Sequence, residues 1–229
     1  MAAGKGTRLG DLAAGDPKSY LEINSESLIE RQVRLMREIG VDEIVIVTGY
    51  KKERFEKDFS APDVTFAFNP FYDFANVLSS YWCAKHLLKD DLVYMHADTI
   101  YSRKILNDLM SKSGDIVLPV DYKSCGEEEM KVKTRDGLVY EINKTMPPEE
   151  AEGEFIGLAK ISRNTLPYLN ASSERLMANK DFNAFIEMSF QELIDRNEAK
   201  LTAFSINGEP WNEIDFEEDY QEAVRLFLK

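Results

Sequence analysis

The sequence has 229 residues, of which 44% are hydrophobic, and a formal net charge of −13. The chain is long enough for a sizeable core, and so acidic a surface repels nucleic acid and anionic lipid. No stretch reaches the roughly 20 apolar residues of a membrane span, so we expect no nucleic-acid or membrane partner. Cys83 and Cys125 lie far apart without metal-type spacing, and no secretory leader is visible, which favours reduced thiols in a cytoplasmic protein.

Helix and strand patterns alternate through the first half of the chain. Ser27 and Glu30 form a capping box before an apolar stripe that ends at Gly40, which predicts a helix. The other predicted helices are 76–88 and 102–112, and the predicted strands are 42–50, 64–69, 91–98 and 115–122. This order predicts an α/β, Rossmann-like mixed sheet, mostly parallel, with helices on both faces.

The pattern changes after residue 122. Residues 129–144 alternate in polarity around Asp136-Gly137, a hairpin turn signal. A strand at 153–162, a helix at 181–196, a strand at 200–206 and a helix at 215–229 follow. We expect a single domain over 1–229, in which 123–148 forms a small β-hairpin lid or subdomain against the same sheet.

The opening stretch AAGKGTRLG is rich in glycine and basic residues, and several interpretations of it compete. A dinucleotide-binding fingerprint needs a third glycine one residue earlier than Gly10, and a Walker loop needs a different spacing. A surface turn without a ligand is the plain alternative. The fourth interpretation is a triphosphate loop, because glycine backbone can approach phosphates closely and Arg8 and Lys18 add positive charge.

The fourth interpretation gains support from motifs along the chain. AAGKGTRLG followed by GDPKSYLEI resembles the signature of the sugar-phosphate nucleotidyltransferases. The stretches NPFYDFANVLSSYWCAKHLL, VYMHADTIYS, EGEFIGLAKIS and WNEIDFEEDYQEA resemble later family segments in the same order, over most of the chain. Within that superfamily the sequence is most similar to the phosphocholine cytidylyltransferase-like branch, which includes enzymes for inositol 1-phosphate and 2-aminoethylphosphonate.

The resemblance implies a set of site residues. It implies Mg²⁺ ligands at Asp98 and Asp215, and charge-stabilising catalytic side chains at Arg8, Lys18 and Lys144. The implied nucleotide-binding residues are Ala2, Ala3, Gly4, Lys5, Gly6, Thr7, Asn76, Ser79 and Ser80. The implied acceptor-binding residues are Tyr122, Lys131, Glu154 and Trp211.

Each of these residues also has a plain structural interpretation. Asp98 and Asp215 can be helix N-caps. The helix predicted from residue 76 can be capped by Asn76, Ser79 and Ser80. Lys144 can be a solvated surface lysine. Most of the aromatic residues can belong to the core. His96 is expected to be tucked in rather than to bind metal, because Mg²⁺ prefers oxygen.

The implied activity is transfer of a nucleotidyl group from CTP to a small phosphate or phosphonate, with release of pyrophosphate. We expect a cationic acceptor of the phosphocholine or 2-aminoethylphosphonate type, held by aromatic faces and carboxylates. The alternatives are a sugar-1-phosphate or inositol-1-phosphate nucleotidylyltransferase and a catalytically degenerate nucleotide-binding regulator. The resemblance is compatible with a homodimer. Family members begin with a short central strand before the glycine-rich loop, so we expect that strand to be truncated here or replaced by another segment.

Overall fold

The structure is a computed structural model that describes every residue except 7–8, 10–11, 13–14 and 229. Thr7, Arg8 and Gly10 therefore lie outside the described residues. The helices are α1 (Leu28–Glu38), α2 (Lys52–Asp58), α3 (Val77–Ala84), α4 (Arg103–Met110), α5 (Leu166–Ala178), α6 (Ile186–Asp195) and α7 (Glu217–Phe227), with short 3-10 turns η2 (Lys18–Tyr20), η3 (Lys85–Leu87) and η4 (Pro148–Glu150).

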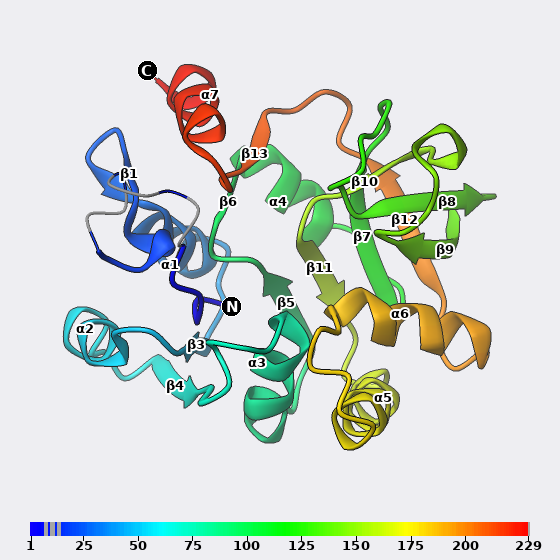
Figure 1. Cartoon of the computed structure of the whole chain (residues 1–229), viewed down its shortest axis with the longest axis horizontal. Coiled ribbons are helices and arrows are strands. Elements are labelled where there is room, and N and C mark those ends of the chain that lie inside the picture. Colours follow the sequence, from blue (N-terminus) through cyan, green and yellow to red (C-terminus); the bar gives the residue numbers. More distant parts are fainter. Residues whose placement is uncertain (7–8, 10–11, 13–14, 229) are drawn as a thin grey trace.

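The strands form one larger sheet and three strand pairs (Figure 1). The larger sheet has the order β10 (Gly153–Phe155), β8 (Lys131–Arg135), β9 (Leu138–Asn143), β12 (Leu201–Ser205), β7 (Ile116–Asp121), β11 (Leu158–Ile161) and β5 (Leu92–Met95). The pairs join β3 (Ile44–Thr48) to β4 (Val64–Phe68), β6 (Thr99–Tyr101) to β13 (Trp211–Glu213), and β1 (Glu22–Ile23) to β2 (Glu26–Ser27).

The predicted mixed α/β architecture is confirmed, although fewer strand pairs are parallel than we expected. Among the described pairings, β3–β4 and β7–β12 are parallel. Strand β11 runs antiparallel to both β5 and β7, and the hairpin strands β8 and β9 pair antiparallel with each other. The difference arises because β9, β10 and β11, from the second half of the chain, run opposite to β7, whereas β12 runs parallel to it.

Strand β7 lies in the centre of the core and is buried on both faces. Ile116, Leu118 and Val120 pack into a cluster with side chains of α3, α5 and α6. Val117 packs instead with side chains of α1 and α4. Alternate residues of a strand point to opposite faces, so the unbroken apolar run of this strand reflects helices on both of its sides, as the sequence predicted.

Several local signals are confirmed. Ser27 caps α1 with the full capping box to Glu30, and the Ser102 hydroxyl accepts a hydrogen bond from the backbone N–H of Ile105. Asp136 and Gly137 both have positive φ values, 53° and 76°, at the β8–β9 turn. Such a turn matches the right-handed twist of the two strands.

Two expectations about elements were wrong, and some elements were not predicted. The strand predicted over 153–162 is broken into β10 and β11 at Gly157, whose φ is 72° and whose added Cβ would lie 2.8 Å from His96 Nδ1. The helix predicted over 181–196 begins only at Ile186, since a turn precedes it. Helix α5 was not predicted, because its apolar positions are interrupted by serines that turn out to be buried.

The first residues of the chain lie between β3 and β5. Ala2 N–H donates to the Val47 carbonyl and Tyr50 N–H donates to that of Ala3, at 2.9 and 3.1 Å. On the other side the Met1 amine donates to the Met95 carbonyl at 2.8 Å and Ala97 N–H donates to that of Met1 at 3.1 Å. Beyond Met1 a largely apolar cavity of about 220 Å³ continues between these strands, with Val45 and Val93 in its lining. We call this cavity the apolar slot.

Candidate active site

Two strand ends bring Asp98 and Asp215 together. Asp98 follows β5 and precedes β6, whereas Asp215 lies two residues after β13. Strands β6 and β13 pair antiparallel, and Ile214 N–H donates to the Asp98 carbonyl at 3.0 Å. Neither aspartate is a helix cap, because a strand follows Asp98, and Asp219 accepts hydrogen bonds from the backbone N–H groups of Asp215 and Phe216 at the start of α7.

The side chain of Lys18 lies between the two carboxylates. Its Nζ donates to Asp98 Oδ2 at 2.9 Å and to Asp215 Oδ1 at 2.5 Å. Lys18 follows Pro17 in η2, and its side chain is only 12% exposed. The two aspartates therefore aim oxygens at one point, and a single cation occupies that point.

The electrostatics of the three groups are linked. Burial alone would lower the pKa of Lys18, but the neighbouring Asp98 and Asp215 outweigh it and raise the pKa above its ordinary value. Burial would likewise raise the pKa of Asp98, yet Lys18 and His96 hold it below the ordinary value. The lysine is thus charged and Asp98 ionised at neutral pH.

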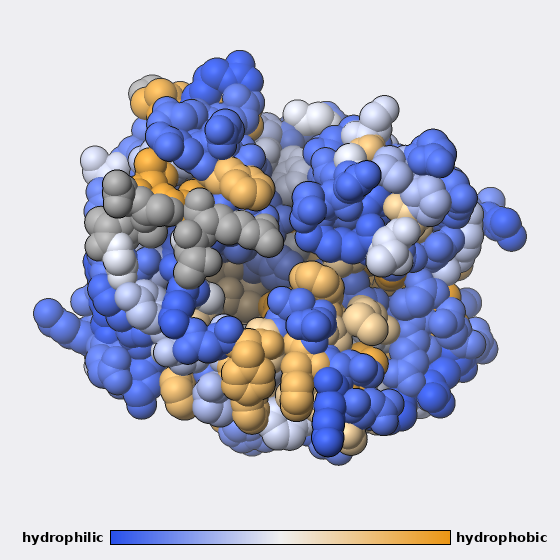
Figure 2. All heavy atoms as spheres, in the orientation of Figure 1, coloured by the Kyte–Doolittle hydropathy of each residue, from blue (hydrophilic) through white to orange (hydrophobic). Residues whose placement is uncertain are grey.

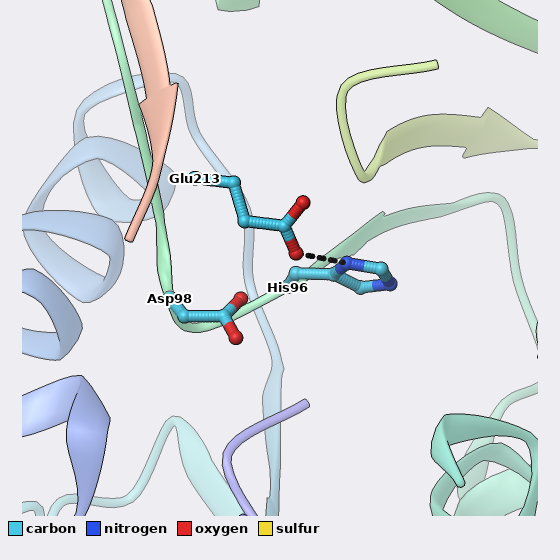
Figure 3. A group of neighbouring side chains, drawn as sticks. All are labelled: His96, Asp98 and Glu213. Carbon is cyan, nitrogen blue, oxygen red and sulfur yellow. Dashed lines mark ion pairs between the residues drawn. The ribbon is translucent and has the colours of Figure 1, made fainter. Parts of the chain in front are cut away.

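A third acidic side chain, Glu213, joins the site. Figure 3 shows His96, Asp98 and Glu213 converging, with the imidazole facing the Glu213 carboxylate. Their ligand atoms all lie within 4.8 Å of one another, and His96 Nδ1 is 3.8 Å from Glu213 Oε1. The other ring nitrogen of His96 lies 2.8 Å from the Tyr94 hydroxyl. His96 is thus tucked between partners, as the sequence suggested.

The glycine-rich loop packs directly on Lys18. Gly6 has a φ of 69°, and a Cβ at this position would lie 2.7 Å from Lys18 Cβ, so no side chain fits there. Lys5 forms an ion pair with Asp73 and lies over the rings of Tyr50 and Tyr72. Gly4 is exposed, whereas Ala2 and Ala3 are buried.

The polar residues at the start of α3 are occupied by local hydrogen bonds. The Asn76 side chain donates to the Asn183 carbonyl at 2.7 Å. Ser79 and Ser80 are buried, and both hydroxyls accept from Nδ2 of Asn69 at 3.0 Å. Asn69, itself buried, is the centre of this network. Sequence reasoning missed it, although its place directly after a buried strand was a signal.

Two of the predicted lysines contact groups other than Asp98 and Asp215. Lys131 is fully buried, and its ammonium donates to the carbonyls of Glu127, Glu129 and Lys144, so its three N–H groups are all occupied. The Nζ atom of Lys144 lies 3.5 Å from Glu128 Oε2, and it also lies over the Phe185 ring. In this structure Lys131 ties the preceding loop to the end of the hairpin, which is a structural role.

Beside Asp215 a second cavity, of about 370 Å³, contains Glu154 and Trp211 in its lining. Eight of its 13 described lining residues are Asp or Glu, and one is a lysine, Lys123. We call this cavity the acidic pocket. Tyr122 is largely exposed and does not line it. Figure 2 shows a hollow near the middle of one face, with mostly hydrophilic surface around it and a hydrophobic patch at its lower edge.

Sequence reasoning also missed Glu213, Asp121, Lys123 and Gln32. Gln32 is buried on α1, and its amide donates to the carbonyls of His96 and Thr99, at 2.7 and 3.0 Å, so it holds the turn that presents Asp98. Glu213 could have been noticed, because it is a second carboxylate only two residues before Asp215 in the stretch WNEID.

The donor set fits a hard divalent cation. Asp98 converges with Glu213 and His96 on one side, and it shares the Lys18 ammonium with Asp215 on the other. The three carboxylates offer oxygens, which Mg²⁺ prefers over nitrogen. The observation that Asp98 and Asp215 already bind one cation, the Lys18 ammonium, shows that their oxygens can converge on a shared charge.

A glycine-rich loop here packs on a lysine beside converging carboxylates at strand ends, an arrangement that is typical of phosphate-binding sites in α/β proteins. The sequence pattern of the MobA-like NTP transferase domain family matches residues 1–164, and the chain belongs to this family. It is therefore a nucleotidyltransferase, as its resemblance predicted.

Individual relatives agree with this placement. The chain is 29% identical to the CTP:phosphoglutamine cytidylyltransferase of Campylobacter jejuni, over 98% of this chain and 97% of that protein. Its fold is similar to the solved CTP:phosphocholine cytidylyltransferase of Streptococcus pneumoniae, with a TM-score of 0.82 and 23% identity over 98% and 96% of the two chains. It is also similar to the inositol-1-phosphate CTP transferase of T. maritima, with a TM-score of 0.79 and 17% identity over 98% and 91%.

No helix among the described residues combines the length and the apolar character that crossing a membrane requires.

Proposed function

We propose that the protein is a Mg²⁺-dependent cytidylyltransferase that joins CTP to a small phosphorylated acceptor with a cationic group and releases pyrophosphate. The observation that carries the proposal is the contact of Lys18 with both Asp98 and Asp215 at the edge of the acidic pocket. A phosphate-binding cation and a pair of cation-binding carboxylates thus meet where a second substrate can enter.

The reaction needs no covalent enzyme intermediate. A phosphate oxygen of the acceptor attacks the α-phosphorus of CTP, a new P–O–P bond forms, and the bond to the β-phosphate oxygen breaks with loss of pyrophosphate. Positioning and charge stabilisation supply most of the rate in such transfers. We assign the ammonium of Lys18 to the negative charge that develops on the triphosphate, with Arg8 as a second candidate outside the described residues.

The glycine-rich loop is our candidate for the triphosphate. It is packed on Lys18 through Gly6, so phosphates bound by its backbone N–H groups would lie near that ammonium. Lys5 ties the loop to the segment around Asp73, which precedes α3. This link supports a nucleotide site between the loop and the start of α3, where Asn76 lies.

Mg²⁺ would be held by Asp98 and Asp215, with Glu213 beside them, and would supply Lewis-acid stabilisation of phosphate charge. In this structure the ammonium of Lys18 contacts both aspartates and balances one of their two negative charges. A divalent cation held by Asp98 and Asp215 would take oxygens that Lys18 now contacts, so the Lys18 ammonium would then be available to bind phosphate.

The acidic pocket supports a cationic acceptor. Carboxylates dominate its lining, and Trp211 offers an aromatic face, whereas polyols are recognised through many donors and acceptors. Glu154 and Trp211 are the acceptor residues we retain. The choice of CTP rests on the similarity of this chain to several cytidylyltransferases, among them the one from Campylobacter jejuni.

The test is a pyrophosphate-release assay with CTP, UTP, ATP and GTP against phosphocholine, 2-aminoethylphosphonate, phosphoglutamine, inositol 1-phosphate and glucose 1-phosphate. We expect CTP with one of the first three acceptors to give the highest kcat/KM, and EDTA to abolish turnover. A preference for inositol 1-phosphate or glucose 1-phosphate would overturn the acceptor class, and full turnover in EDTA would overturn the metal dependence.

A further inference from the structure

The acidic pocket already contains a cation from the protein itself. Lys123 lies between β7 and β8 and is the basic residue among the described residues that line the pocket. Its Nζ is 2.8 Å from Glu154 Oε2 and 3.8 Å from Asp121 Oδ2, and it lies 5.2 Å from the centroid of the Trp211 ring. One ammonium thus contacts two carboxylates and an aromatic face.

The groups around this ammonium are fixed by other contacts. The indole Nε1 of Trp211 donates to Asp121 Oδ2 at 3.0 Å, and β13, which begins at Trp211, pairs with β6. Glu154 lies on β10, between β7 and β8, and its side chain is only 7% exposed. Trp211 and Asp121 thus hold each other independently of Lys123, and the pairing of β10 fixes the backbone of Glu154, so the three groups together form an ammonium site.

Lys123 itself is held less firmly than its partners. Its side chain is 41% exposed, and it belongs to the irregular segment between the two strands. A long, flexible lysine at such a position can leave for water without disturbing the sheet. The pocket continues from this point to Glu213 and Asp215, so an acceptor that places its ammonium here can extend its phosphate toward the proposed reaction centre.

We propose that Lys123 is a tethered ammonium that occupies the cation subsite of the acceptor and must be displaced by the cationic group of the acceptor. This inference rests on the proposed function. Lys123 then sets specificity. An incoming ammonium replaces the positive charge of Lys123 beside Glu154 and Trp211, whereas an uncharged polyol would leave these groups without a cation. The tether also weakens the binding of every cationic acceptor, since an intramolecular competitor is always present.

Direct binding of a probe tests the inference without turnover. Tetramethylammonium chloride is titrated at constant ionic strength into Trp82→Phe protein, in which Trp211 is the remaining tryptophan, and fluorescence is recorded. We expect Lys123→Met to bind the probe about fivefold more tightly, on the scale of one lost ion pair and cation–π contact. Lys123→Arg keeps the competing charge and should resemble the parent.

Lys112→Met is the matched control, because Lys112 also lies over an aromatic ring, that of Phe204, at 5.0 Å, but does not line the acidic pocket. It should leave the affinity unchanged. Glu154→Gln should weaken probe binding with or without Lys123. Thermal melts of all variants show that each is folded.

Kinetics separate this inference from the proposed function. With the preferred cationic acceptor, Lys123→Met should lower the acceptor KM severalfold and leave the KM for CTP unchanged. Unchanged or weaker probe binding in Lys123→Met, or a higher acceptor KM, would overturn the inference and make Lys123 a ligand for an anionic part of the acceptor. If no acceptor is turned over by any variant, the proposed function fails, while the probe titration still decides the role of Lys123.

Discussion

The apolar slot and the acidic pocket are both cavities next to β-strands, but they are lined by opposite kinds of side chain. The slot, about 220 Å³, lies between the neighbouring edges of β3 and β5 and is lined mainly by aliphatic side chains. The pocket, about 370 Å³, is lined mainly by carboxylates and contains the ammonium of Lys123. An apolar cavity lowers stability, whereas charged groups gathered around a cavity mark a candidate ligand site. We therefore expect changes at the pocket to affect ligand binding and catalysis, and changes at the slot to affect stability.

The largest expected effect belongs to the carboxylates at the edge of the pocket. Asp98→Asn and Asp215→Asn should each lower kcat by about 100-fold or more, because charge stabilisation supplies most of the rate. Thermal melting should change little in comparison. Steady-state pyrophosphate release measures the effect, and a double variant with parental activity would place the reaction elsewhere.

Lys18 should show the next largest effect. Lys18→Ala should lower kcat by about 100-fold and raise the KM for CTP much less, since the ammonium acts on charge that develops during the reaction. The same variant should bind Mn²⁺ more tightly without nucleotide, because its competitor for Asp98 and Asp215 is gone. Mn²⁺ titration followed by electron paramagnetic resonance checks this, and weaker Mn²⁺ binding would contradict the competition.

Filling the apolar slot should change the stability of the protein rather than its binding of ions. An extended apolar segment of about six residues, a typical strand length, fused before Met1 can pair with both β3 and β5 and fill the cavity. We expect a melting temperature higher by about 5 °C, on the scale of a few kcal/mol. A Gly/Ser prefix of the same length is the control, and equal melting temperatures for the two prefixes would show that the slot does not accept a strand.

The smallest expected effect is the pH dependence of Glu154. Burial raises its pKa from 4.5 to about 7, although Lys123 acts in the opposite direction. The folded state therefore binds the proton more tightly than the unfolded state, so this contribution to stability is complete below pH 4.5 and is lost as the pH rises through 7. Glu154→Gln should flatten the pH dependence of the melting temperature between pH 4.5 and 7. An unchanged profile would assign the dependence to other groups.

The ionisation of Glu154 should also appear in acceptor binding. A cationic acceptor binds the carboxylate rather than the carboxylic acid, so its KM should fall as the pH rises through about 7 in the parent and stay level in Glu154→Gln. An equal pH dependence in both proteins would separate Glu154 from the acceptor.

Local signals in the sequence predicted much of the fold. The capping box at Ser27, the cap at Ser102 and the Asp136-Gly137 turn each depend on neighbouring residues, and all three are confirmed. The break at Gly157 was missed because it depends on His96, which is remote in the sequence. The burial of Lys131 against three carbonyls was also not predicted, since a lysine in a strand is normally expected to be exposed.

The site residues also divide into those that the sequence marks and those that only the tertiary fold brings together. Asp98 and Asp215 were predicted as a pair through the family resemblance, and in the structure both contact Lys18. Their binding of a metal ion stays a prediction. The places of Lys123 and Asp121 depend on how β7, β10 and β13 come together. Their side chains meet Trp211 from about 90 residues away, a distance at which no sequence pattern operates.

Product formation tests the central claim most directly. CTP, Mg²⁺ and the preferred acceptor are incubated with parent enzyme or Asp98→Asn, and the reaction is followed by ³¹P NMR. We predict that the parent forms pyrophosphate and a CDP-linked acceptor in equal amounts, and that Asp98→Asn forms neither at a comparable rate. Binding of CTP by the parent without either product, for any of the tested acceptors, would contradict the claim and favour a nucleotide-binding regulator.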